Sequence, residues 1–180
     1  MAYKIPFRGE FYEVDRSGFL IFLEMYISGI KDTALSIANL HGVGMACISE
    51  RYKKLFYAAR DDFRQHKEMI ISQMDDEENK QLYERFAELA DKIWENEDNI
   101  IAGYAKLFNL DLSLPSHRRK FITKFNAYRI TENESHGYDC NAPKEILETG
   151  KNSLEIIPKL DEIANNLITR IKRLNQETIK

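Results

Sequence analysis

The chain has 180 residues, 43% of them hydrophobic and 31% charged, and a formal net charge of −3. This size allows one domain, or a small domain joined to a larger one, with a hydrophobic core. A transmembrane helix is excluded because the most apolar stretch, residues 19–27, is too short and contains Glu24. Residues 1–16 mix charged and apolar side chains and contain no signal-peptide core, so we expect a soluble, cytoplasmic protein.

Charge divides the chain into three parts. Residues 1–60 have a net charge of +2, residues 61–110 of −7 and residues 111–180 of +2. Because nucleic acid carries a negative charge on every phosphate, the acidic middle part cannot supply a binding surface for it, whereas either end can. The two cysteines, Cys47 and Cys140, match no metal or redox spacing and are expected to be free thiols.

The chain is expected to begin with an extended segment and a helix. Residues 3–14 alternate apolar and polar side chains around Gly9, which predicts an extended arm or a small hairpin. Residues 17–28 instead place their apolar side chains on one helical face. Gly29 is expected to end this helix, since glycine commonly follows the last helical turn.

A turn that contains glycine joins the next two expected helices. Asp32 is a candidate N-cap for a short helix, which residues 42–44 end before a third helix begins. A helix-turn-helix needs a small residue in its first helix, a glycine four positions later and an apolar residue inside its second helix. Ala38, Gly42 and Ile48 meet these requirements. The same residues also suit a purely structural corner in a helical bundle.

The remainder is expected to be helical apart from its loops. Asp75 or Asp76 can cap a long helix in the middle of the chain, and Ser116 can cap a later one. Residues 130–143 are the least helical stretch and predict a functional loop or a linker. A long helix after Pro158 has the clearest apolar stripe, formed by Leu160, Ile163, Leu167, Ile171 and Leu174.

These elements predict an all-α protein. We expect a three-helix unit resembling a helix-turn-helix within residues 1–56, preceded by a short extended arm. This unit would pack on a larger helical bundle, residues 57–180, as two domains or as one continuous domain. The apolar surface of the last helix exceeds what docking on one chain requires, which predicts a homodimer.

The run I-A-x-x-x-G-V at residues 37–43, followed by Ile48 and Tyr52, resembles the N-terminal domain of the TetR regulators. The resemblance covers about residues 17–56 and implies an all-helical homodimer that binds a specific DNA sequence. It implies six DNA-binding positions, with Gly44, Met45 and Ser49 at the start of the recognition helix and Arg51, Lys53 and Lys54 holding phosphates. A helix-hairpin-helix, whose backbone amides hold a phosphate, is an alternative for residues 40–44.

A second resemblance concerns Arg129 and His136. An arginine, six residues and a histidine before a long closing helix resemble the pair of the HEPN ribonucleases of defence or toxin systems. The resemblance implies RNA cleavage without metal, in which His136 transfers a proton and Arg129 stabilises charge on the phosphate. The pKa of a histidine lies near neutrality and suits that role. Two solvated loop residues are the alternative.

No other chemistry is indicated by the sequence. His41, His66 and His117 form no pair with the spacing of metal ligands, so we expect neither a metal nor a cofactor. Three functions remain open: a DNA-binding regulator, a ribonuclease, and a non-catalytic helical inhibitor or assembly protein that binds another protein. The DNA-binding regulator is the main expectation.

Overall fold

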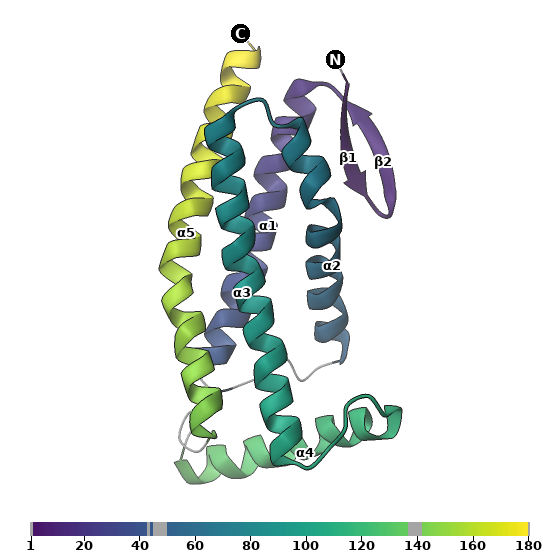
Figure 1. Cartoon of the computed structure of the whole chain (residues 1–180), viewed down its shortest axis with the longest axis vertical. Coiled ribbons are helices and arrows are strands. Elements are labelled where there is room, and N and C mark those ends of the chain that lie inside the picture. Colours follow the sequence, from purple (N-terminus) through teal and green to yellow (C-terminus); the bar gives the residue numbers. More distant parts are fainter. Residues whose placement is uncertain (1, 43, 45–49, 137–141, 180) are drawn as a thin grey trace. The chain divides into compact units, whose positions relative to one another are not determined.

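The computed structural model describes residues 2–42, 44, 50–136 and 142–179, and for residues 50–52 and 129–136 it describes the backbone only. A hairpin and five helices make up this described part (Figure 1): β1 (Tyr3–Phe7), β2 (Glu10–Val14), α1 (Arg16–Gly42), α2 (Glu50–Gln73), α3 (Glu77–Leu107), α4 (Pro115–His136) and α5 (Lys144–Ile179). The predicted all-α class is confirmed, with the small sheet as an addition at the N-terminus.

The chain forms two compact units, each assembled from segments that are distant in sequence. Unit 1 comprises Met1–Thr33, Ala59–Asp91 and Pro158–Lys180, and unit 2 comprises Ala34–Ala58 and Lys92–Ile157. Helices α1, α2, α3 and α5 each contribute to both units, whereas the hairpin belongs to unit 1 and α4 to unit 2. Residue 56, the expected domain boundary, lies within α2.

The N-terminal hairpin is attached to unit 1 along β1. Its two turn residues, Arg8 and Gly9, have positive φ angles of 50° and 79°, which match the right-handed twist of paired strands. The side chain of Gln73 binds the outer edge of β1. Its amide oxygen accepts from the Lys4 backbone N–H at 2.6 Å, and its NH₂ group donates to the Lys4 carbonyl at 2.9 Å. The extended segment is therefore a hairpin.

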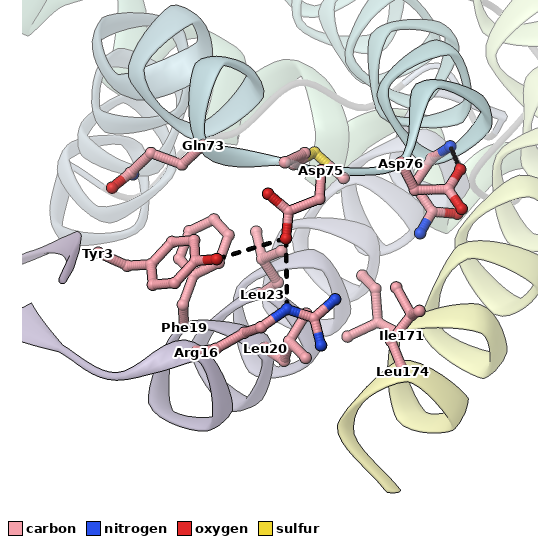
Figure 2. Close-up of a pocket in the computed structure, with 12 residues that line it drawn as sticks. Tyr3, Arg16, Phe19, Leu20, Leu23, Gln73, Asp75, Asp76, Ile171 and Leu174 are labelled. Atoms are coloured by element: carbon pink, nitrogen blue, oxygen red, sulfur yellow. Dashed lines mark hydrogen bonds and ion pairs between the residues drawn. The ribbon is translucent and has the colours of Figure 1, made fainter. Parts of the chain in front are cut away.

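A small cavity of unit 1 lies where β1, α1 and α5 approach the turn between α2 and α3 (Figure 2). Asp75 accepts hydrogen bonds from the Tyr3 hydroxyl and the Arg16 guanidinium, both at 3.3 Å. Asp76 accepts from the backbone N–H of Asn79 at 3.0 Å, which confirms the expected N-cap of α3. The cavity has a volume of about 20 Å³, enough for about one water molecule and too small for an organic ligand.

Two helices continue through residues at which the sequence predicts a boundary, an end at Gly29 and a start after Pro158. Gly29 lies inside α1, between the buried side chains of Ile27 and Ile30. Their burial offsets the roughly 1 kcal/mol that a glycine costs in a helix. Pro158 likewise lies inside α5. The expected helix end at Gly29 is wrong, and the three-helix unit that depended on it is not confirmed.

The last two helices also differ from expectation. Because α4 extends to His136, the loop expected over residues 130–143 is wrong for residues 130–136. Residues 137–141 of that loop lie outside the described residues. The apolar stripe of α5 is buried in unit 1 of the single chain, as Leu160, Ile163, Leu167 and Ile171 show. These side chains are therefore not free to cover a second chain.

In unit 2, α1 ends against α5 at a contact too close for a side chain. A Cβ atom at Gly150 would overlap the backbone carbonyl oxygen of His41. Since both partners belong to helix backbones, a methyl group at this position would force the helices apart.

We therefore expect Gly150→Ala to destabilise the protein by about 2–3 kcal/mol. For a chain of this size, this corresponds to a melting temperature lower by about 5–10 °C in a circular dichroism melt. Gly29→Ala is the matched control, because its Cβ would meet no atom within 4 Å. This control should gain about 0.5–1 kcal/mol. Similar melting shifts in both variants would contradict the close contact.

Candidate nucleic-acid interface

Unit 2 contains a polar network whose central side chains, His41, Glu97 and Ser153, are buried. The imidazole of His41 is hydrogen-bonded through Nε2 to the Glu97 carboxylate at 2.6 Å and through Nδ1 to the Ser153 hydroxyl at 2.8 Å. The amide of Asn96 donates to Ser153 at 2.9 Å and to the side chain of Asn152 at 3.0 Å. The side chains on α1, α3 and α5 are thus joined by satisfied polar groups.

This network has the side chains of a nucleophilic site, but a substrate cannot reach them. A hydroxyl, an imidazole and a carboxylate in hydrogen-bonded sequence is an arrangement that can activate a serine. Here Ser153, His41 and Glu97 are each 0% exposed, so a substrate cannot reach the hydroxyl. We therefore assign the network to the packing of unit 2 and place the candidate site elsewhere in the same unit.

Helix α4 lies across the end of α3 (Figure 1), where aromatic rings hold it. Tyr104 meets Phe125 edge to face with ring centroids 4.8 Å apart, and Phe108 packs on Phe121 at 5.9 Å. Burial raises the pKa of Tyr104 above its ordinary value, so its hydroxyl stays protonated and donates to the Gly44 carbonyl. These contacts fix the first half of α4 on the surface of unit 2.

The loop before α4 is ordered by its own hydrogen bonds. The Asp111 carboxylate accepts from the hydroxyl and the backbone N–H of Ser113, at 2.7 and 3.0 Å. The hydrogen bond from the Ser113 hydroxyl holds the pKa of Asp111 below its usual value. The backbone N–H of Asp111 in turn donates to Nδ1 of His117 at 2.9 Å. Leu112 is therefore held in place between two anchored residues.

The start of α2 is placed beside α4 by two aromatic contacts. Phe56 packs on Trp94 of α3 with ring centroids 5.6 Å apart, which holds α2 on α3. About one turn earlier, the ammonium of Lys53 lies over the ring of Phe121, 5.2 Å from its centre. This cation–π contact joins α2 directly to α4.

The starts of α2 and α4 and the loop before α4 border an open hollow of about 370 Å³, here called the basic hollow. Four cationic and four apolar side chains line it: Lys53, Lys54, Arg118 and Arg119, and Leu112, Pro115, Phe121 and Ile122. No acidic residue is among the described residues that line it. Such a concentration of one charge raises the local concentration of anions.

The charges at the start of α4 oppose the dipole of the helix. The N-terminal end of a helix carries a partial positive charge that favours acidic residues, but the first turn of α4 contains none. Arg118, Arg119 and Lys120 follow instead, and the sequence has no acidic residue between Asp111 and Glu132. A bound anion would relieve this repulsion, so the start of α4 is suited to a phosphate.

Two of the six predicted DNA-binding residues, Lys53 and Lys54, line the basic hollow. Gly44 is buried in the turn after α1, where its φ of 72° favours glycine. The side chains of the remaining three, Met45, Ser49 and Arg51, lie outside the described residues. The predicted recognition helix therefore stays a prediction, whereas the two predicted phosphate contacts at Lys53 and Lys54 lie in a defined basic surface.

The predicted nuclease pair lies on α4, with Arg129 inside the helix and His136 at its last residue. Seven positions along a helix correspond to about 10 Å along its axis. The side chains of both residues lie outside the described part of the chain, so RNA cleavage stays a prediction.

Arg118 and Arg119 are not among the residues that the sequence patterns single out. Their signal is three consecutive cations in a stretch that lacks acidic residues. Nothing in the sequence joins this run to Lys53, which belongs to another helix. The packing of Lys53 on Phe121 makes that connection.

No protein-family model matches this chain, and comparisons with curated proteins and with solved structures give no match. Within the described residues, no three His, Cys, Asp or Glu side chains gather to hold a metal ion. None of the described helices combines the length and apolar character needed to cross a membrane. The basic hollow remains as a surface with a definable ligand chemistry.

Glu97→Ala is expected to lower the free energy of unfolding by about 1–3 kcal/mol, because it leaves Nε2 of the buried His41 without its hydrogen-bond partner. Urea unfolding followed by circular dichroism measures this change. Glu95→Ala, on the same helix, removes an exposed carboxylate that pairs with Lys92 at 3.3 Å, and should cost less than about 1 kcal/mol. Equal losses in the two variants would argue against the importance of the buried pair.

Proposed function

We propose that this chain binds nucleic acid through the basic hollow, with DNA as the polymer that the sequence favours. One observation carries the proposal: Lys53 and Lys54 of α2 and two arginines of α4 line the same hollow, without an acidic residue among its described lining. Cations that neutralise phosphates release condensed counterions, which drives binding of any nucleic acid sequence.

The chemistry of the individual side chains supports phosphate as the ligand. The planar guanidinium groups of Arg118 and Arg119 can each donate two parallel hydrogen bonds to a phosphate. Lys53 is already held over Phe121, so less side-chain entropy is lost when it binds an anion. Such contacts position a nucleic acid but do not read its sequence. In a regulator, that reading would belong to Met45 and Ser49.

A homodimer would present two basic hollows to one DNA molecule. Because the α5 stripe is buried within one chain, the dimer stays a prediction of the sequence rather than a part of this proposal. The alternative function is that of a helical protein that binds another protein. Such a protein need not bind DNA, so a direct DNA-binding measurement distinguishes the two functions.

Fluorescence anisotropy with labelled DNA of about 20 nucleotides, as single strand and as duplex, tests the proposal. Four phosphate contacts predict that affinity falls about 50- to 150-fold between about 50 mM and about 200 mM salt. The double variant Arg118→Gln/Arg119→Gln should bind more weakly, and its salt slope should fall by about one for each arginine.

The control is Lys106→Gln/Lys151→Gln, which removes the same charge from two exposed lysines of unit 2 that do not line the basic hollow. It should keep the salt slope of the unchanged protein. The proposal fails if neither form of DNA binds at the lower salt concentration, or if both double variants lose affinity equally.

A further inference from the structure

The cations of the basic hollow do not distinguish a single strand from a duplex, because both present phosphates. The apolar side chains beside these cations can distinguish a single strand from a duplex. Leu112 and Ile122 are half-buried and Pro115 is exposed, so the hollow keeps apolar surface in contact with solvent. In a duplex the bases are paired and stacked inside, and the phosphates form the outer surface. A bound duplex would therefore leave this apolar surface exposed to solvent.

An unpaired nucleotide matches both parts of the hollow. It offers a charged phosphate and, next to it, the apolar face of a base. Proteins that bind single strands combine a positive groove with aromatic side chains on which bases stack. In the basic hollow, aliphatic side chains supply the corresponding apolar surface. The apolar surface beside Arg118 and Arg119 is the feature of the hollow that a phosphate alone does not explain.

We infer that the basic hollow takes one unpaired nucleotide of a single-stranded nucleic acid. This inference rests on the proposed function and names its preferred ligand. The phosphate of the nucleotide binds Lys54, Arg118 and Arg119, and its base packs against Leu112, Pro115 and Ile122. Lys53 covers the ring of Phe121, so the base rests on aliphatic side chains, and the Lys53 ammonium binds the phosphate of a neighbouring nucleotide.

The size of the hollow suits one nucleotide. Its volume of about 370 Å³ lies at the lower end of the range for small-molecule sites, about 300–1,000 Å³. Neighbouring nucleotides of the strand therefore lie outside it and contribute through their phosphates.

The apolar side of the hollow is also formed before the ligand arrives. Leu112 lies between Asp111 and Ser113, whose hydrogen bonds fix the loop, and Pro115 is the first residue of α4. A preformed surface loses little conformational entropy on binding. Removal of apolar surface at Leu112 should then affect affinity without rearranging the loop.

Two measurements with the unchanged protein test the inference. At equal salt, a single strand should bind about 10-fold more tightly than the duplex, since removing about 50–60 Å² of apolar surface from water beneath a base is worth a factor of this order. A strand of the same length with abasic sites keeps every phosphate but lacks bases. It should bind about 10-fold more weakly than the normal strand, with an unchanged salt slope.

Variants locate the effect in the hollow. Leu112→Ser should weaken single-strand binding about 5- to 30-fold, because apolar surface buried by the base is lost, and leave duplex binding unchanged. Leu107→Ser is the control, because Leu107 is 48% exposed on α3 of the same unit and does not line the hollow. Thermal melts establish that each variant is folded. If Leu112→Ser unfolds, the abasic strand carries the test, since it needs no substitution.

The outcomes separate this inference from the proposed function. Equal binding of normal and abasic strands, or of single strand and duplex, overturns the inference. In that case the proposed function still holds if Arg118→Gln/Arg119→Gln weakens binding of both forms. If neither the single strand nor the duplex binds, both the inference and the proposed function are overturned.

Discussion

The hydrogen bond between His41 and Glu97 is the constraint on which unit 2 depends. Both side chains are 0% exposed, and a buried carboxylate is costly unless a partner satisfies it. Helices α1, α3 and α5 must therefore pack so that His41 meets Glu97 and Ser153 together. Gly150 permits the required approach of α5 to the end of α1. Arrangements that separate these groups would leave a buried polar atom unpaired, so the network selects one packing of the helices.

The basic hollow is built outward from α3. The end of α3 carries Tyr104 and Phe108, on which α4 packs, and Trp94 earlier in the helix holds Phe56 of α2. The contact of Lys53 with Phe121 then joins the two helices that surround the hollow. The cationic side chains therefore extend from two helices that both pack on α3. This packing fixes the distance between the backbone positions of the cations on α2 and on α4.

The charges near the N-terminus of α4 lower the local stability of this helix. Acidic residues would be favoured in its first turn, yet the turn contains none, and Arg118 and Arg119 follow it. A cluster of like charges beside a helix N-terminus is unfavourable unless an anion binds there. Natural proteins commonly depart from such local rules at functional sites and rely on the rest of the fold to compensate. The aromatic packing of Phe121 and Phe125 against α3 supplies that compensation.

The sequence by itself determined the helical class, and it narrowed the N-terminus to an extended arm or a hairpin and the N-cap of α3 to Asp75 or Asp76, because periodicity and capping depend on neighbouring residues. It did not determine that α1 continues through Gly29. The local cost of a helical glycine, about 1 kcal/mol, is smaller than the gain from burying the isoleucines around it, and that burial exists only in the packed structure. The candidate site divides in the same way: Lys53 and Lys54 stand out as cations near a glycine turn, but their grouping with Arg118 and Arg119 was decided by tertiary structure. That grouping depends on a contact between side chains of two separate helices, Lys53 on Phe121, which neither local sequence encodes.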